Sequence, residues 1–357
     1  MFFEQISTES VLFFILYGIT GVVPAIAAAY LLFRKGNAFV PDITPPVRLR
    51  RWTAAFFIVS ALAHVWWLLF YIYSSDMQSV VNLVLATLDC LLLFTTFAGT
   101  LLSMLQDRKR PVWPALVIAM PFVALAGALM AYPSRLLEQM TAYYILLLCV
   151  LFTGYMVVMI RQYGRWLNDN YADLENKKVW LSQTVALGCM LLFVLYVFAT
   201  DMVLIWLIHI IQLVLYGLLL WRVETLPQLP DLADQPLAAP ATIDLAQIEQ
   251  LLAEHCVGTQ LYLQHDLTLQ QLAQAVGTNR FYLSQYFSRQ SITYNSYINN
   301  LRINHFISRY QEVVASRQPV SAQQLALESG FRSYSTFSRA FRQRMGQSVT
   351  VWMRNSD

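Results

Sequence analysis

The sequence predicts an all-α protein with a seven-helix transmembrane bundle followed by a cytoplasmic, all-helical double helix-turn-helix domain. Three observations predict it. Of the 357 residues, 57% are hydrophobic and only 13% charged, which is about half the charge of a typical soluble protein. The apolar residues are concentrated in runs long enough to cross a bilayer, and the polar C-terminal part contains one helical pattern twice. This composition excludes a disordered chain, a coiled coil and an enzyme built only from soluble domains.

The first part of the chain contains seven apolar runs, each with about the 20 residues that a membrane-spanning helix needs. They lie near residues 10–33, 52–73, 80–105, 112–132, 142–162, 180–199 and 202–221. Only Thr200 and Asp201 separate the last two runs, which favours a tight hairpin over one very long helix. Aromatic residues at the ends of the runs are typical of interfacial anchors; they are Trp52, Tyr73, Trp113, Tyr132, Trp180 and Trp221.

The basic residues predict the orientation of the bundle. They are found in alternate loops and after the last run: Arg34, Lys35, Arg48, Arg50, Arg51, Arg108, Lys109, Arg110, Arg161, Arg165, Lys177, Lys178 and Arg222. The opposite loops contain only Arg135. Because cytoplasmic loops carry an excess of Lys and Arg, we expect the N-terminus outside and the C-terminus in the cytoplasm. The N-terminus lacks the basic region of a cleavable signal peptide, so the first run is predicted to be a retained helix.

Composition divides the chain into three parts. Residues 1–222 form the predicted transmembrane sensor domain, and residues 223–243 form a linker that contains Pro227, Pro230, Pro236 and Pro240. Such a stretch is extended and semi-rigid. Residues 244–357 are polar and amphipathic, and they begin with a helical pattern of Leu245, Ile248, Leu251 and Leu252 behind Asp244 as N-cap. We expect this last part to be an all-helical soluble domain.

Two stretches of the C-terminal domain, residues 268–290 and 321–344, repeat one pattern. Each begins with a hydroxyl N-cap, Thr268 or Ser321, ahead of a short helix. Each continues with a Leu–Ala pair and, four residues after the alanine, a glycine that supplies a left-handed turn; these glycines are Gly277 and Gly330. A second helix follows, with its inward residues at Leu283 and Phe287 or at Phe337 and Phe341. The pattern therefore predicts two helix-turn-helix units, which a long helix over 294–310 connects.

The domain resembles the DNA-binding domain of the arabinose-regulator (AraC) family of bacterial transcription factors. The resemblance covers roughly residues 260–354 and is carried by the segments GTNRFYLS from Gly277, YINNLR ending at Arg302, and GFRSYSTFSRAF ending at Phe341. It implies a bacterial regulator that binds promoter DNA. Together with the seven apolar runs, it leads us to expect such a regulator in the bacterial inner membrane. The chain departs from the family pattern at Val349, where proline is usual, and at Gln290–Ser291, where a glycine usually follows the recognition helix.

The second helix of each unit is expected to enter the major groove, because this is how helix-turn-helix units dock on DNA. The expected DNA-binding residues are Asn279, Arg280, Phe281, Ser284, Gln285, Arg289, Arg332, Ser333, Tyr334, Ser335, Ser338, Arg339 and Arg342. Gln285 can pair with adenine and Arg339 with guanine, whereas Arg289, Arg332 and Arg342 are expected at phosphates. Between Arg280 and Arg354 there are ten arginines and two acidic residues. The alternative is that these are solvated polar faces.

Polar residues inside the apolar runs indicate where a signal could be detected, because ionisable groups are costly within a membrane. The candidate sensor pocket consists of His64, Trp66, Asp89, Trp206, His209 and Gln212. We expect this pocket to open to the outside and to bind a ligand or a proton. A structural polar network that pairs helices is the alternative.

Other function classes are not supported by the sequence. The four cysteines occur singly, without the spacing of a zinc site or a disulfide framework, so no metal and no cofactor are expected. Neither HExxH nor GxSxG occurs, and we expect no enzyme. The expected partners are double-stranded DNA, the lipid bilayer and an unidentified ligand from outside or dissolved in the membrane; homodimer formation stays open. The alternative function is a membrane receptor whose helical tail binds a cytoplasmic protein.

Overall fold

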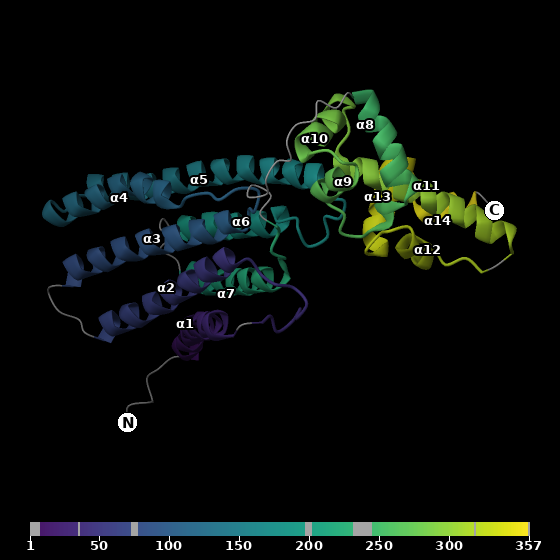
Figure 1. Ribbon diagram of the computed structural model, residues 1–357. Coiled ribbons are helices and arrows are strands. Elements are labelled where there is room, and N and C mark those ends of the chain that lie inside the picture. Colours follow the sequence, from purple (N-terminus) through teal and green to yellow (C-terminus); the bar gives the residue numbers. More distant parts are fainter. Residues whose placement is uncertain are drawn as a thin grey trace. The chain divides into compact units, whose positions relative to one another are not determined.

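The computed structural model describes residues 8–34, 36–72, 78–196, 202–230, 245–317 and 319–355. Within these ranges it contains fourteen α-helices and no strand, so the predicted all-α fold class is confirmed (Figure 1). The first seven helices are α1 (Thr8–Phe33), α2 (Val47–Ile72), α3 (Gln78–Ser103), α4 (Trp113–Ala131), α5 (Arg135–Asn170), α6 (Trp180–Tyr196) and α7 (Met202–Thr225). The chain forms two compact units. The first comprises residues 1–163 and 179–229, and the second comprises residues 164–178 and 230–357.

The seven predicted runs correspond to helices α1 to α7. Within the described residues, five helices are long and apolar enough to cross a membrane: Thr8–Phe33, Val84–Ser103, Trp113–Ala131, Arg135–Asn170 and Trp206–Thr225. The apolar part of α6 is shorter, at Trp180–Val194, and α2 begins with three arginines in its first turns. Five spans are therefore supported by length and composition, and the count of seven stays a prediction.

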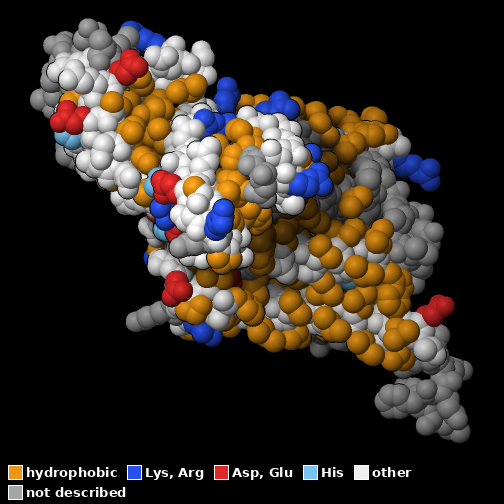
Figure 2. Space-filling view, turned by 90° about the vertical axis from the view of Figure 1, so that its right-hand side faces the viewer, with side chains coloured by type: hydrophobic (Ala, Val, Ile, Leu, Met, Phe, Trp, Pro, Cys, Tyr) orange, Lys and Arg blue, Asp and Glu red, His pale blue; other side chains and the backbone are white. Residues whose placement is uncertain are grey.

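The helices of the first unit expose large apolar side chains on their outer faces. Ile26 is 65% exposed, Val117 57% and Leu151 59%. Hydrophobic side chains cover a large part of the face shown in Figure 2. Soluble monomers rarely expose apolar patches of more than a few hundred Å², so this surface is suited to contact with lipid.

Small residues allow helices α1, α2 and α3 to approach closely. A Cβ atom added to Gly21 of α1 would lie 3.1 Å from the Cβ of His64 on α2. On α3, an added Cβ at Gly99 would overlap the ring of Trp52. Close approach of this kind is typical of membrane helices, which associate through van der Waals packing at small residues.

The chain after α7 packs against the first unit before it reaches the linker. Helix α7 continues to Thr225, three residues into the stretch predicted as linker. Leu226 and Leu229 are buried. The side chain of Gln106 donates a hydrogen bond to the Pro227 carbonyl (3.0 Å) and accepts one from the Leu229 amide (2.9 Å). Residues 231–244, with most of the predicted linker and the Asp244 N-cap, lie outside the described residues.

The second compact unit contains the helices after the linker. They are α8 (Leu245–Leu252), the π-helical turn η1 (Ala253–Gly258), the 3₁₀ turn η2 (Leu261–Leu263), α9 (Leu269–Ala275), α10 (Arg280–Arg289), α11 (Tyr294–Ala315), α12 (Ala322–Glu328), α13 (Tyr334–Met345) and α14 (Val349–Arg354). The pairs α9–α10 and α12–α13 are the two predicted helix-turn-helix units. Helix α11 connects them and ends five residues beyond the predicted Tyr310.

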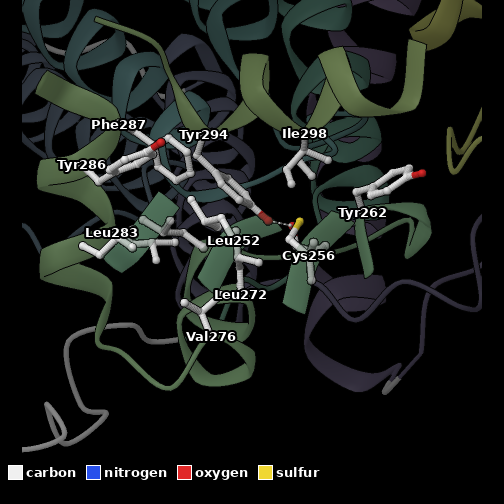
Figure 3. Packing of buried hydrophobic residues seen from close by; sticks show 14 residues of the cluster. Leu252, Cys256, Tyr262, Leu272, Val276, Leu283, Tyr286, Phe287, Tyr294 and Ile298 are labelled. Carbon is white, nitrogen blue, oxygen red and sulfur yellow. Dashed lines mark hydrogen bonds between the residues drawn. The ribbon is translucent and has the colours of Figure 1, made fainter. Parts of the chain in front are cut away.

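Each of the two helix-turn-helix units has its own hydrophobic core. The first core joins α8, α9, α10 and the start of α11, with Leu252, Leu272 and Leu283 among its buried residues (Figure 3). The second core joins the later part of α11 to α12, α13 and α14. Helix α11 contributes to both, through Ile298 to the first and Phe306 to the second, and both side chains are fully buried. The connecting helix therefore acts as the common support of the two units.

Candidate functional sites

The first helix of each unit is stabilised at its N-terminus by its predicted cap. The Thr268 hydroxyl accepts a hydrogen bond from the Gln271 amide (3.2 Å), while the Gln271 side chain accepts one from the Thr268 amide (2.9 Å). These two bonds form a capping box. In the second unit, the Ser321 hydroxyl accepts from the Gln324 amide at 3.3 Å. Both helices thus begin where the sequence predicts.

The alanine and glycine of the repeated pattern form the same turn in both units. Gly277 has φ +75° and Gly330 has φ +88°. The amide after each glycine donates a hydrogen bond to the carbonyl of the patterned alanine, from Thr278 to Ala273 at 2.8 Å and from Phe331 to Ala326 at 3.2 Å. This six-residue closure with a left-handed glycine is the Schellman motif. It fixes where the chain leaves the first helix and hence how the second helix is presented.

Each second helix is capped by a residue that was also predicted to contact DNA. The Asn279 side chain accepts a hydrogen bond from the Tyr282 amide at 3.0 Å and begins α10. The Ser333 hydroxyl accepts from the Thr336 amide at 3.3 Å and begins α13. Their side chains therefore position the recognition helices, in addition to any contact with DNA.

The inward faces of α10 and α13 are apolar, as the sequence predicts. Leu283 and Phe287 are buried in the first core, and Phe337 and Phe341 are buried in the second core. The opposite faces expose six of the expected DNA-binding residues: Phe281, Ser284, Gln285, Ser335, Arg339 and Arg342. Phe281 is 57% exposed, although large aromatic side chains are usually mostly buried. Arg289, in the last turn of α10, is also exposed.

Five expected DNA-binding residues are partly buried: Asn279, Arg280, Ser333, Tyr334 and Ser338. Tyr334 packs against Phe337, with ring centroids 5.8 Å apart. Ser338 is half-buried on the same helix. Arg280, at the start of α10, has a buried Nη1 atom without a hydrogen-bond partner among the described residues. This last feature indicates that the arginine is held close to the protein surface and is not extended into solvent.

Arg302 of α11 joins the two units, a role that the sequence does not reveal. Its side chain is 1% exposed, and it donates hydrogen bonds to the carbonyls of Tyr262 (2.7 Å), Gln264 (2.7 Å) and His265 (3.2 Å). Its guanidinium also lies 5.7 Å from the ring centroid of Phe331 in the second unit. Burial lowers the pKa of Arg302 to about 10, so the group stays cationic at neutral pH.

Two departures from the family pattern have local structural explanations. Ser291 follows α10 with φ +53°, and the Ile292 amide donates to the Phe287 carbonyl at 3.1 Å. This is the turn that glycine forms after the first helix of each unit, here with serine in the left-handed position. Val349 is the first residue of α14 after the Ser348 cap, the helix position that proline tolerates best. Neither departure removes an element of the fold.

The structure places two of the candidate sensor residues, His64 and His209, at one hydroxyl of α1, and a third, Gln212, beside His209. Thr20 Oγ1 lies 3.1 Å from His209 Nδ1 and 3.1 Å from His64 Nε2. Gln212 Oε1 lies 3.2 Å from His209 Nδ1. These contacts connect α1, α2 and α7. Thr20 was not identified from the sequence, because a single threonine in an apolar run carries no distinctive pattern.

Asp89 of α3 forms a second polar cluster with two tryptophans of α2. Its Oδ2 accepts hydrogen bonds from the indole nitrogens of Trp66 (3.1 Å) and Trp67 (2.7 Å). The residue is 6% exposed, and its Oδ1 has no hydrogen-bond partner among the described residues. Trp206, the remaining candidate, packs edge-on against Phe13 at 6.0 Å.

Comparison with known proteins identifies the C-terminal domain. Residues 272–355 match a family model described as a helix-turn-helix domain. No curated protein and no solved structure matches the chain. The matched region begins inside α9 and ends at α14, so it contains both recognition helices and the helix between them. Residues 272–355 therefore match the AraC-type helix-turn-helix family, which is a family of DNA-binding regulatory domains.

Proposed function

We propose that the chain is a membrane-anchored, one-component transcriptional regulator, in which a seven-span sensor controls sequence-specific DNA binding. One observation carries the DNA-binding part: two units with the same cap, turn and inward packing each present an exposed polar helix face. A double unit of this kind is suited to two successive stretches of major groove, because each recognition helix occupies one.

The exposed residues divide into two roles. Gln285 and Arg339, on the outer faces of α10 and α13, have the side-chain chemistry to pair with adenine and guanine, respectively. Arg289 and Arg342 lie in the last turns of the same helices, where cationic side chains reach phosphates. Base contacts give sequence preference, whereas phosphate contacts give affinity that depends on salt.

The proposed membrane arrangement has the N-terminus outside and the DNA-binding domain in the cytoplasm. Five long apolar helices and their exposed apolar faces support insertion. The basic residues of alternate loops support the orientation. A bacterial inner membrane is the location in which such a protein could reach the chromosome directly.

We further propose that the polar clusters around Thr20 and Asp89 detect the signal. A buried carboxylate with one oxygen unpaired among the described residues is costly in a membrane, and a ligand donor or a proton would satisfy it. Since hydrogen bonds in these clusters connect α1, α2, α3 and α7, a change in them would shift the packing of these helices. Such a shift between two packings is the physical basis of a two-state receptor.

Binding of the full-length protein, in detergent micelles, to labelled duplex DNA over a range of salt concentrations tests the DNA-binding part. Arg342→Gln and Arg289→Gln are each expected to lower affinity for all duplexes and to reduce the salt slope by about 1. Arg309→Gln is the matched control, since it removes the same charge from α11, where Arg309 pairs with Glu312 at 2.5 Å. A duplex affinity that does not change with salt concentration, or no binding to any duplex, would favour the alternative in which the tail binds a protein.

A second experiment tests sequence reading. After selection of preferred sites from a random duplex pool, Gln285→Ala is expected to cost about 1–3 kcal/mol of discrimination at one base pair while leaving the other positions unchanged. The control is Gln343→Ala, because Gln343 is exposed on α13 and was not assigned to the DNA-facing side. An unaltered site preference would contradict the assignment of Gln285.

A reporter gene under a selected site tests the sensor. Asp89→Asn keeps the size of the side chain and removes its charge, and it should abolish the response to the inducing condition at normal protein level. Thr95→Val on the same helix is the control, because among the described residues the Thr95 hydroxyl donates to the Leu91 carbonyl of its own helix (2.7 Å) and to no other helix. An unchanged response in the Asp89 variant would show that the cluster is structural.

A further inference from the structure

The second compact unit, which holds the C-terminal domain, also contains a short segment from far upstream in the chain, residues 164–178. Helix α5 ends at Asn170, and residues 164–178 belong to the same compact unit as the C-terminal domain. Tyr171 forms an antiparallel bridge with Thr268, the cap of α9. The Ala172 amide donates a hydrogen bond to the Leu267 carbonyl at 3.1 Å. This pairing provides hydrogen-bond partners for main-chain groups that a loop would otherwise leave to water.

Asn295, in the first turn of α11, holds the same segment from the other side. Its amide donates to the carbonyls of Tyr171 (3.2 Å) and Ala172 (2.7 Å). Ala172 is 1% exposed and belongs to the first hydrophobic core. The segment is therefore packed into the domain at its start, by two elements that flank the first helix-turn-helix unit.

Further along, the acidic side chains of the segment contact the second helix-turn-helix unit. Asp173, 2% exposed, lies 3.8 Å from Arg332, which also lies 3.7 Å from Asp266. The Glu175 carboxylate accepts a hydrogen bond from the Thr336 hydroxyl at 3.3 Å. Thr336 is in the first turn of α13. Arg332 and the start of the second recognition helix are thus engaged by carboxylates.

The segment also lies near one arginine of each recognition helix, Arg280 of α10 and Arg339 of α13. Burial raises the pKa of Tyr171 to about 12, and the nearby positive charge of Arg280 opposes this shift. Burial lowers the pKa of Lys178, and the neighbouring Arg339 lowers it further. Three of the arginines expected at DNA are therefore close to residues 171–178.

We propose that residues 171–178 are an intramolecular inhibitor that occupies the DNA-binding surface and must leave before a duplex can bind. This inference rests on the proposed function, because the same arginines are assigned to DNA. Carboxylates and phosphates are alternative ligands of an arginine, so Asp173 takes a position beside Arg332 that a phosphate would need. Glu175 adds a negative charge at the start of α13, where it accepts from the Thr336 hydroxyl. The occupant is a named part of this chain, and its charge complements the surface that it covers.

The docked state is suited to a reversible switch. Its ion pairs to the domain are 3.5–3.8 Å long, and each joins a buried side chain of the segment to an exposed partner, Asp266 or Arg332. Water around the exposed partner weakens such pairs. Lys178 faces the like charge of Arg339, which opposes docking. Because the segment directly follows α5, whose earlier part is a candidate membrane span, a shift or rotation of that helix would be passed to the segment along the chain.

The first test compares duplex affinity of full-length variants in micelles, with a labelled random-sequence duplex at low salt. Asn295→Ala removes two hydrogen bonds from the docked segment without changing charge, and it should bind at least about fivefold more tightly, since a masked site loses affinity in proportion to its unmasked fraction. Glu175→Gln should also bind more tightly than Asp169→Asn. Asp169 is the matched control, because it is exposed in the last turn of α5, just before the proposed inhibitor, and its loss changes net charge equally. Equal affinities in the wild type and the Asn295 variant would overturn the proposal.

The second test traps the docked state. Glu175→Cys and Thr336→Cys are combined with Cys90→Ala and joined by a short reducible cross-linker. The duplex affinity of the cross-linked protein should fall at least tenfold and return on reduction. Each variant with only one of the two introduced cysteines should bind the duplex with and without the reductant. No cross-link, or a cross-linked protein that binds normally, would overturn the inhibitor. A cross-link without duplex binding by any variant, before or after reduction, would instead overturn the proposed DNA-binding function.

Discussion

Gly330 makes the sharpest prediction about how the second recognition helix is positioned. An alanine Cβ at this position would lie 2.7 Å from the Cα and 2.7 Å from the carbonyl oxygen of Leu263 in η2. Both are backbone atoms, so no side-chain rotation can relieve the overlap. The backbone also has φ +88°, which is strained for any residue with a Cβ. Gly330→Ala therefore combines two separate penalties.

Gly277 isolates one of these penalties. It has φ +75°, but an added Cβ would meet no atom within 4 Å. The left-handed conformation costs an L-residue about 1–2 kcal/mol, and overpacking adds about 1–3 kcal/mol. We expect Gly277→Ala to lower the free energy of local unfolding by about 1 kcal/mol and Gly330→Ala by about 3 kcal/mol.

Hydrogen exchange of the full-length protein measures this difference. Because each 1.4 kcal/mol is a factor of about ten, amide protection in α12 and α13 should fall about 100-fold in the Gly330 variant. Protection in α9 and α10 should fall only about fivefold in the Gly277 variant. Equal losses in the two variants would refute the argument that contact with Leu263 fixes the second turn.

Three further predictions concern single residues of the domain. Ser291→Gly should stabilise α10 by about 1 kcal/mol because it relieves the left-handed strain at φ +53°; a destabilised variant in thermal unfolding would contradict this. Val349→Pro should change the free energy of unfolding by less than about 1 kcal/mol, because proline is tolerated at the first helical position. Val351→Pro should instead unfold α14, because the Val351 amide donates to the Ser348 cap (3.3 Å). Arg302→Met should cost about 3 kcal/mol or more, because three carbonyls lose their charged donor. Hydrogen exchange should then rise in both helix-turn-helix units; a rise confined to α9 would show that Arg302 does not join them.

Much of the DNA-binding domain could be predicted because its determinants are local. The caps Thr268 and Ser321 act over three residues, and the alanine–glycine turns close over five. Such short hydrogen-bonded rings depend on residue types at fixed spacing, which a sequence displays directly. The connecting helix was predicted for the same reason, since its apolar positions follow helical periodicity.

The candidate DNA-binding residues were harder to assign because one residue type serves two purposes. Asn279 and Ser333 have side chains that can accept from a backbone amide or from a base, and here they cap α10 and α13. Tyr334 is the first residue of α13, and its packing on Phe337 depends on the second core. Sequence spacing gives the helix face but not the tertiary partner.

Residues 171–178 could not be placed from the sequence, because they meet Thr268, Asn295 and Thr336 across about a hundred residues or more of chain and share no repeated pattern with them. Their charges indicated only membrane orientation, to which Lys177 and Lys178 contributed.

The charge of the recognition surface explains why such a segment would be found there. Between Arg280 and Arg354 the chain has ten arginines and two acidic residues. A surface of this kind attracts phosphates over a long range, and without DNA it also attracts any carboxylate that the chain can bring to it. A buried carboxylate such as that of Asp173 is tolerated only with cationic partners, and Arg332 and Lys177 supply them. The lysines that accompany the acids keep this attraction weaker than that of a polyanion, so that duplex DNA can displace the segment once a change in α5 has loosened it.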